Sequence, residues 1–303
     1  MYNSPLVSIL CISMNHEKYI EKSFLSVVNQ TYSPFEVLYV DNYSSDRSFQ
    51  IGDAIFKNSG LPYKGFKRER IFGISENINF LINHAVGKYI SIISGDDWWE
   101  LNNIDEKIQF YEQHPYYGML YGGGFFYFHD TGKIKIEKSN DYKSGWVLKD
   151  VLKRNFLNSV GAIIKMETIN KVGLFDEASP LEDWDMWIRI AEKYEIGLYK
   201  KPLVYYGKQT GSNISESNAY MNSGYNYIFK KYSHYKEIDV AIQHRKLLDL
   251  YDDAAKRPNF KNLLHLFKNY QFTFLHFKQV VKCILVIFGI KIKLFKKDEI
   301  ENR

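Results

Sequence analysis

Short apolar runs alternate with amphipathic stretches along the first hundred residues. Three runs that are rich in β-branched residues predict buried strands at 6–12, 35–40 and 88–93. Between them, apolar residues recur at helical spacing, most regularly over 74–85, and Gly87 follows as a helix stop. Alternation of strand and helix predicts an α/β fold, in which helices cover both faces of a parallel sheet.

The regular alternation is lost in the second half of the chain. Residues 104–111 predict a short helix that ends before Pro115, and 129–133 predict a hairpin turn after an aromatic, glycine-interrupted run. A further strand is expected at 161–165 and a helix at 181–194. Because a hairpin pairs its strands antiparallel, we expect a mixed sheet here.

Polar side chains follow three of the predicted strands. Asn15 comes after the first, Asp41 after the second, and Asp96 with Asp97 after the third. Sheets of this class bind ligands at the carboxyl ends of their strands, although a single Asp there is more often a helix cap. Since polar groups stand at several of these ends, we expect them to form one site.

The adjacent carboxylates of Asp96 and Asp97 repel each other unless another group compensates their charge. A divalent metal ion that also binds a phosphate would do so. The alternative is a solvated Asp-Asp turn that simply ends the strand. The pair alone leaves both interpretations open.

Three acids open the last predicted helix, namely Glu182, Asp183 and Asp185. The helix dipole favours acids at this position whatever else they do. Trp184 and Trp187 lie three residues apart, and we expect them either in the core or as a platform for the apolar face of a sugar. Of these two roles we expect the core, because large aromatic residues are mostly buried.

Composition excludes several classes of protein. The 303 residues are 45% hydrophobic, 25% charged and 17% aromatic, which indicates a globular rather than a disordered chain. Two cysteines are too few for a disulfide framework and indicate a reducing compartment. The first residues lack the pattern of a signal peptide, and no run reaches the ~20 apolar residues of a membrane span. We therefore expect a cytoplasmic catalytic part.

Charge is unevenly distributed along the chain. Residues 256–303 hold eleven Lys and Arg against three Asp and Glu, a net charge of +8, so the overall +5 leaves −3 for residues 1–255. A basic tail argues against a body that binds nucleic acid. Apolar residues alternate with these lysines, and we expect a helical extension that either lies on an anionic membrane surface or packs as a structural cap.

These features together resemble the family 2 glycosyltransferases of the GT-A fold over roughly residues 1–215. The resemblance rests on motifs in a shared order: Ser13-Met14-Asn15, Asp41 followed by Asn-x-Ser-x-Asp, Asn77 before Gly87-Lys88-Tyr89-Ile90, Asp96-Asp97, and Gly-x-Phe-Asp-Glu before Glu182-Asp183. It implies a Rossmann-like, mixed but mainly parallel sheet flanked by helices, with residues 216–303 as a C-terminal helical extension.

The resemblance also implies a role for each part of the site. Residues 1–100 would be the half that binds the nucleotide sugar, and 101–215 the acceptor half. Asp183 would be the catalytic base, and Asp97 would bind Mn²⁺ or Mg²⁺. The donor would be held by the remaining motif residues: Ser13, Asn15, Asp41 at the base, Asn77, and Asp96 at the ribose.

The chain departs from the family pattern at four positions. Ser94 stands where many members carry another Asp, and Met14 replaces a Tyr that stacks on the base. Glu76 takes the place of a common Arg, so a cationic contact to the donor is missing there. Lys208 lies where the family often has Arg and His before a loop, and its charge could replace a phosphate contact.

By this resemblance we expect a metal-dependent, inverting hexosyltransferase. It would move a sugar from a nucleotide diphosphate sugar, above all a UDP-sugar, to a hydroxyl of a glycan or lipid-linked acceptor. The expected setting is the biosynthesis of a bacterial surface polysaccharide, such as a capsule or lipopolysaccharide. We expect no nucleic-acid partner, and either a cytoplasmic or a peripheral membrane location through residues 256–303; a homo-oligomer stays open.

Two other functions compete with this one. Sugar nucleotidyltransferases share the parallel sheet and the metal-binding aspartates, but residues 12–20 contain no glycine and so lack their glycine-rich loop. A degenerate module that only binds nucleotide sugars or glycans is the second alternative. The departures from the family pattern favour it, and the joint presence of all four site aspartates argues against it.

Overall fold

The computed structural model describes residues 4–137, 142–209, 217–256, 281 and 284–285. The chain forms two compact units: residues 1–151 with 155–228, and residues 152–154 with 229–303. All predicted site residues belong to the first unit. The predicted divisions after residues 100 and 215 stay predictions, and the predicted properties of the basic tail fall almost entirely outside the described residues.

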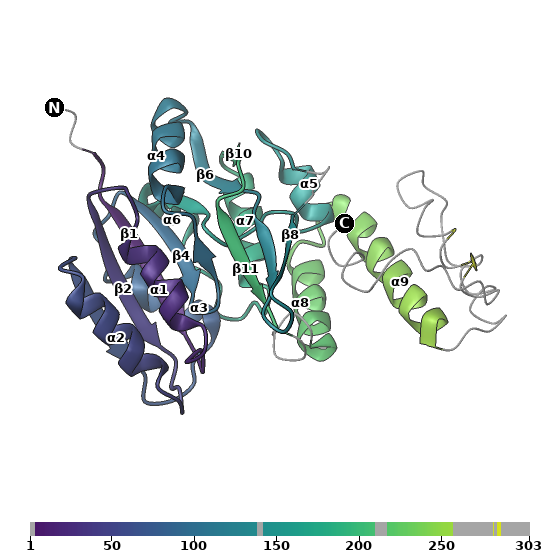
Figure 1. The fold of residues 1–303 in the computed structure, drawn as a ribbon. Coiled ribbons are helices and arrows are strands. Elements are labelled where there is room, and N and C mark those ends of the chain that lie inside the picture. Colours follow the sequence, from purple (N-terminus) through teal and green to yellow (C-terminus); the bar gives the residue numbers. More distant parts are fainter. Residues whose placement is uncertain (1–3, 138–141, 210–216, 257–280, 282–283, 286–303) are drawn as a thin grey trace. The chain divides into compact units, whose positions relative to one another are not determined.

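A seven-stranded sheet forms the centre of the first unit, in the order β10-β6-β9-β4-β1-β2-β3 (Figure 1). Its strands are β1 Val7–Ser13, β2 Phe35–Asp41, β3 Tyr63–Lys67, β4 Tyr89–Ser94, β6 Tyr117–Gly122, β9 Ile163–Lys165 and β10 Glu195–Tyr199. Strand β1 pairs in parallel with β2 and β4, whereas β9 runs antiparallel between β4 and β6. The predicted mixed, mainly parallel sheet is confirmed.

Helices flank this sheet, as predicted, and α1 and α2 lie together on one side of it (Figure 1). The helices of the described chain are α1 Ile20–Val28, α2 Ser48–Asn58, α3 Ile74–Ile82, α4 Asn103–Gln113, α5 Leu148–Lys153, α6 Met166–Val172, α7 Glu182–Ala191, α8 Asn218–Lys231 and, in the second unit, α9 Glu237–Lys256. Helix α7 ends three residues before the predicted end at Tyr194, because the chain turns there into β10. None of the helices in the described part of the chain combines the length and hydropathy of a membrane span.

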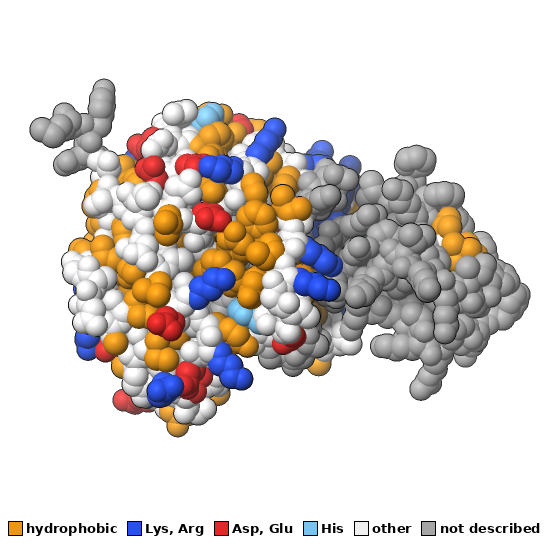
Figure 2. Space-filling view, viewed as in Figure 1, with side chains coloured by type: hydrophobic (Ala, Val, Ile, Leu, Met, Phe, Trp, Pro, Cys, Tyr) orange, Lys and Arg blue, Asp and Glu red, His pale blue; other side chains and the backbone are white. Residues whose placement is uncertain are grey.

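A second, four-stranded sheet has the order β5-β11-β7-β8. Its strands are β5 Trp98–Trp99, β7 Phe125–Phe128, β8 Lys133–Ile136 and β11 Val204–Lys208. The hairpin predicted at 129–133 joins β7 to β8. Strands β3, β10 and β11 were not predicted, because glycine and polar residues interrupt each of them. Hydrophobic side chains gather over β11 on the side of the molecule shown in Figure 2, with Lys and Arg beside them.

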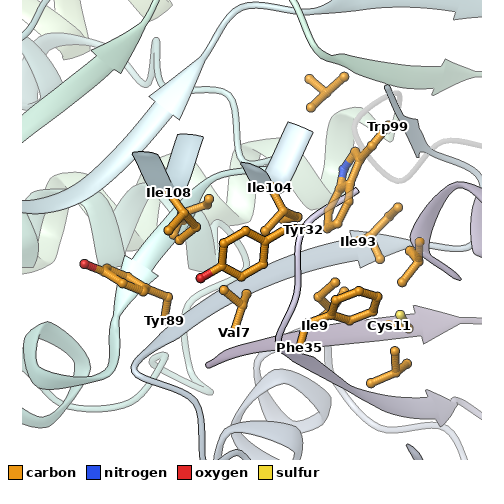
Figure 3. Packing of buried hydrophobic residues seen from close by; sticks show 14 of the residues in the cluster. Val7, Ile9, Cys11, Tyr32, Phe35, Tyr89, Ile93, Trp99, Ile104 and Ile108 are labelled. Carbon is orange, nitrogen blue, oxygen red and sulfur yellow. The ribbon is translucent and has the colours of Figure 1, made fainter. Parts of the chain in front are cut away.

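The hydrophobic core lies between the main sheet and its helices (Figure 3). Strand β2 is buried along its whole length. The rings of Phe24, Tyr39 and Phe56 lie 4.6–5.9 Å apart where α1 and α2 meet β2. Trp99 and Ile104 extend the same core under β4. A rigid core of this kind holds the carboxyl ends of β1, β2 and β4 in fixed positions.

Candidate active site

Asp41 ends β2, and donors from two loops hold its carboxylate. Ser13 donates to Oδ2 at 2.9 Å, while Ser44 donates through its amide to Oδ1 at 2.9 Å and through its hydroxyl to Oδ2 at 2.6 Å. Asp41 and Ser13 are both fully buried. Hydrogen bonds to a carboxylate are strong and directional, so this side chain has a fixed orientation.

Asn15 ties the loop after β1 to the loop after β2. Its backbone lies in the left-handed region with φ 56°, which Asn tolerates better than most residues. Its amide donates to Ser44 Oγ at 2.8 Å, and its Oδ1 accepts from the amide of Ser45 at 2.9 Å. The structure therefore brings Ser13, Asn15 and Asp41 together, as expected for one site at the strand ends.

Asn77 is linked to Asp41 through Arg68, a cation that the sequence patterns did not identify. Its Oδ1 accepts from Arg68 Nε at 3.0 Å, and the Arg68 amide donates to the Asp41 carbonyl at 2.9 Å. Glu76 accepts from the amide of Gly73 at 2.7 Å and so caps α3. Arg68 thus supplies a positive charge near the position where Glu76 replaces the family's Arg, and no local motif marks it.

Asp96 and Asp97 follow β4 but have different surroundings. Asp96 is half-buried; its Oδ1 accepts from Ser94 Oγ at 2.5 Å and lies 4.0 Å from His16 Nδ1. Asp97 is almost fully buried, and its Oδ1 accepts from the amide of Gly207 at 2.8 Å. Burial and then the charge of Asp96 raise the pKa of Asp97 well above its ordinary value, while Gly207 and Lys208 lower it.

The Asp96-Asp97 pair fits a divalent cation. Each carboxylate uses Oδ1 for its hydrogen bond and keeps Oδ2 as a further oxygen donor. His16 Nδ1 is buried, has no hydrogen-bond partner, and lies beside Asp96. No three His, Cys, Asp or Glu side chains cluster in the described ranges, so oxygens of a diphosphate or water would complete the coordination.

Asp183 lies in the first turn of α7 and is half-buried. Its Oδ2 accepts from Asn155 Nδ2 at 3.1 Å, and its Oδ1 accepts from the Trp184 amide at 2.6 Å. Burial raises the pKa of Asp183, and burial together with the charge of Asp183 raises the pKa of Glu182 to about 8. Both carboxyls therefore bind a proton more readily than an ordinary acid does. The hydrogen bonds of Asp183 go to Asn155 and Trp184 and not to the Asp96-Asp97 pair.

Helix α8 covers the start of α7, which the sequence did not indicate. A Cβ on Gly224 would lie 2.4 Å from Leu181 Cγ, so the two helices are in close contact. Tyr227 donates to Asp176 Oδ2 at 2.7 Å. Burial and the charges of Glu182 and Asp183 raise the pKa of Tyr220 to about 12. Tyr220 is thus a protonated hydroxyl close to the two acids.

The tryptophans of α7 belong to the core. Trp184 and Trp187 are only 2% and 1% exposed, and Trp184 Nε1 donates to the Val151 carbonyl at 2.7 Å. A sugar platform at these positions is therefore wrong, because neither ring face reaches solvent. Trp98 and Trp99 are also buried and form β5.

The family comparison agrees with the motif order. The model described as glycosyl transferase family 2 matches residues 8–167, more than half of the chain. An uncharacterized glycosyltransferase of Methanocaldococcus jannaschii is 25% identical over 207 residues, which are 67% of this chain and 71% of that protein. An uncharacterized glycosyltransferase of Rickettsia bellii is 26% identical over 72% of this chain, but only 32% of that protein is covered.

Solved structures share the fold at low sequence identity. S. aureus TarS 1-349 in complex with UDP-GlcNAc has a TM-score of 0.61 at 15% identity, over 94% of this chain and 83% of that one. The mannosyltransferase PcManGT from Pyrobaculum calidifontis, in complex with GDP-Man and Mn²⁺, has a TM-score of 0.57 at 14% identity, over 97% and 89% of the two chains. The predicted GT-A fold is confirmed by these neighbours. With its motifs in family order, a GT-A fold and a family model that spans more than half of its length, the chain belongs to glycosyl transferase family 2.

Proposed function

We propose that this glycosyltransferase inverts the anomeric centre, and that it moves a sugar from a UDP-sugar to a hydroxyl of a glycan or lipid-linked acceptor. The observation that carries the proposal is Asp183. Its carboxylate has a raised pKa, is oriented by Asn155, and stands at a helix start beside Glu182. A carboxylate with a raised pKa is a better general base than an ordinary one, because its proton affinity is closer to that of the acceptor hydroxyl at the moment of transfer.

In this proposal the donor lies along the ends of β1, β2 and β4. Asp41, fixed by Ser13 and Ser44, accepts from the nucleotide base, and Asp96 accepts from the ribose. Asn15 holds the loop that encloses the base. Phosphate groups are bound by cationic side chains, Arg through two hydrogen bonds and Lys as a point charge. Arg68 and Lys208 would supply these contacts to the diphosphate.

The diphosphate leaving group needs charge stabilisation as its bond to the sugar breaks. Asp97 would hold Mn²⁺ or Mg²⁺, which would supply Lewis-acid stabilisation of the diphosphate when bound. The charge of Lys208 lowers the pKa of Asp97, and this supports a second cation near the same position. We therefore assign Lys208 as a second cation at the diphosphate, in place of the family's Arg and His.

Inversion requires one base and no covalent enzyme intermediate. Asp183 would take the proton of the acceptor hydroxyl as its oxygen attacks the anomeric carbon, while the bond from that carbon to the diphosphate breaks on the opposite side. Tyr220 would contribute a hydroxyl beside both acids, since the charges of Glu182 and Asp183 help to raise its pKa. The setting in bacterial surface polysaccharide synthesis, the peripheral membrane location and the oligomeric state remain proposals of the same kind.

A donor panel tests this function. Purified full-length protein is incubated with Mn²⁺ or Mg²⁺ and, one at a time, UDP-Glc, UDP-Gal, UDP-GlcNAc, UDP-GalNAc and GDP-Man, and nucleotide release is measured with and without acceptor glycans. We expect release from a UDP-sugar, loss of release with a chelator, and a product of inverted anomeric configuration by NMR. Retention of configuration, or release of pyrophosphate from UTP and a sugar phosphate, would contradict the proposal.

A further inference from the structure

The four-stranded sheet has one face on which lysines and aromatic rings alternate. Tyr206 pairs with Phe126, and Phe126 with Lys135; two residues along, Lys208 pairs with Phe128, and Phe128 with Lys133. Side chains that are paired or two residues apart share a face of a sheet. We call this surface the lysine-aromatic face, and it consists of six residues: Tyr206, Lys208, Phe126, Phe128, Lys133 and Lys135.

Contacts between these side chains confirm that they lie together. The ammonium group of Lys208 is 4.5 Å from the centroid of the Tyr206 ring and 5.5 Å from that of Phe126. The ammonium group of Lys135 is 5.2 Å from the centroid of the Phe128 ring. The three rings are half-buried, so part of each reaches solvent. Lysines that lie over ring faces are held in place and keep their charge at the surface.

The opposite face of the same sheet is different. Trp98 stacks on Tyr205 with centroids 5.0 Å apart, and Tyr205 stacks on Phe125 at 4.8 Å. In β8, Ile134 and Ile136 are on that side and are 56% and 48% exposed. The lysines of β8 and β11 are all on the lysine-aromatic face, whereas the opposite face is covered by the ammonium group of Lys22 from α1, which lies 3.4 Å from the centroid of the Trp98 ring and 4.6 Å from that of Tyr127. The lysine-aromatic face thus has three lysines against this one, and it is the more basic of the two.

The lysine-aromatic face begins at the candidate active site and runs to the edge of the sheet. Lys208 follows Gly207, whose amide donates to Asp97 Oδ1 at 2.8 Å. Glu137 follows β8 on the same face, and its Oε2 accepts from Asn158 Nδ2 at 2.9 Å. Asn158 lies three residues after Asn155, the partner of Asp183. One end of the face therefore adjoins Asp97, while Lys133 and Lys135 are on edge strand β8.

Resting on the proposed function, we propose that the lysine-aromatic face binds the acceptor, and that this acceptor is an anionic glycan with carboxylate or phosphate groups. Aromatic rings pack against the apolar faces of sugar rings, and lysine side chains bind carboxylate or phosphate groups as point charges. A neutral glycan would leave the lysines unused, and a polyanion without sugars would leave the rings unused. The alternation of both types along a path from the reaction centre fits an anionic glycan.

Edge lysines have another ordinary use, which is to prevent a free strand from pairing with another molecule. That use explains Lys133 and Lys135 but does not explain Phe126, Phe128 and Lys208, which lie on inner strands. If the lysines only protect the edge strand, replacing Phe126 and Phe128 should not change glycan binding. If the face binds the acceptor, replacing them should weaken it.

Binding is measured by calorimetry with full-length protein and no nucleotide. The probes are a hyaluronan oligosaccharide, a phosphomannan oligosaccharide, a neutral malto-oligosaccharide of similar length, and polyglutamate. We expect the first two to bind more tightly than the others, and Lys133→Gln/Lys135→Gln to weaken them about 10-fold and to lower the salt slope by about two between ~50 and ~200 mM salt. The separate double variant Phe126→Leu/Phe128→Leu should weaken both acidic glycans while leaving polyglutamate unchanged.

A matched control has the same charge change on another edge strand. Lys64→Gln/Lys67→Gln in β3, which is also exposed, should leave binding of both acidic glycans unchanged. Equal binding of polyglutamate and acidic glycans with no effect of the aromatic substitutions would overturn the proposal, as would no binding of either acidic glycan. If Lys133→Gln/Lys135→Gln loses binding to phosphatidylglycerol vesicles but keeps its binding to both acidic glycans, the face binds an anionic membrane surface and not a glycan. UDP is titrated in parallel. Absence of UDP binding would contradict the proposed function, whereas normal UDP binding without binding of acidic glycans would contradict only the acceptor proposal.

Discussion

Asp41 and Asp183 are both aspartates at the ends of regular elements, yet their surroundings differ sharply. Asp41 is fully buried, and Ser13 and Ser44 give its carboxylate three hydrogen bonds. Asp183 has one side-chain donor, Asn155, and an acidic neighbour, Glu182, and its pKa is raised. The first environment fixes a carboxylate as a hydrogen-bond acceptor, and the second increases its affinity for a proton. Recognition and proton transfer therefore need opposite surroundings for the same side chain.

Two other ionisable groups resemble Asp183 in being poorly solvated. Asp97 and Lys107 are buried with few hydrogen-bond partners, and burial shifts their pKa values toward the neutral forms. Burial also lowers the pKa of Arg68, although its Nε donates to Asn77 Oδ1. Poorly solvated charges therefore occur both within residues 1–100 and beyond them.

The largest expected effect comes from Asp183→Asn. This variant removes the proton acceptor while keeping shape, so we expect sugar transfer to fall by about 10²–10⁴-fold. Calorimetry with UDP should give a dissociation constant close to that of the wild type. Asp105→Asn, a surface aspartate of α4, serves as control and should leave both quantities unchanged. Equal losses of transfer and UDP binding would break the distinction between the two aspartates.

The reciprocal variant is Asp41→Asn. It removes the charge that Ser13 and Ser44 hold, and charged hydrogen bonds contribute roughly 1.5–3 kcal/mol, so UDP should bind about 10- to 100-fold more weakly. The acidic limb of the pH profile, measured at saturating donor, should stay where it is in the wild type. Unchanged UDP affinity would remove Asp41 from the donor site.

The next largest effect concerns Lys107, a buried amine that we expect to lower the free energy of unfolding. Its side chain is fully buried, its ammonium group donates to the Gly161 carbonyl at 2.8 Å, and burial lowers its pKa to about 7. The unfolded chain keeps this proton to about pH 10, so it binds more protons than the native state above pH ~7, and the free energy of unfolding should rise with pH from there.

Lys107→Met should lose this pH dependence and gain about 1–3 kcal/mol of unfolding free energy at about pH 6, offset in part by the unpaired Gly161 carbonyl. Urea titrations at several pH values measure both effects. Lys149→Met, at an exposed lysine of α5, is the control and should keep the wild-type slope. A variant that is less stable than the wild type at every pH would show that the buried amine is a net stabilising group.

The smallest effect is expected from Glu182→Gln. The pKa of Glu182 is raised to about 8, so this side chain is already neutral over the acidic limb and its replacement removes little charge there. The acidic limb of kcat/KM should therefore stay close to its wild-type position, within about half a pH unit. A clear move to lower pH would mean that Glu182, not Asp183, is the group that titrates in that limb.

Sequence patterns predicted that the polar groups after β1 and β2 lie together, and the structure agrees, while their role in binding a donor stays a prediction. Ser13, Asn15 and Asp41 end neighbouring parallel strands, and the geometry of such a sheet brings those ends together. Arg68, Asn155, Gly207 and Tyr220 were missed, because each meets its partner through the fold and none belongs to a motif. The tryptophans of α7 show the same limit, since helical spacing did not tell a core position from a sugar platform.

The sequence by itself determined strands β1, β2 and β4 and the alternation of helices with them, the strand ends that carry polar groups, and the family. The tertiary structure decided which of these groups are solvated. The pKa of Tyr220 in α8, which begins at Asn218, depends on the charges of Glu182 and Asp183, and the pKa of Asp97 depends on the amide of Gly207 in β11. Desolvation is set by every atom near a group in space, and most of those atoms belong to residues that are distant in the chain.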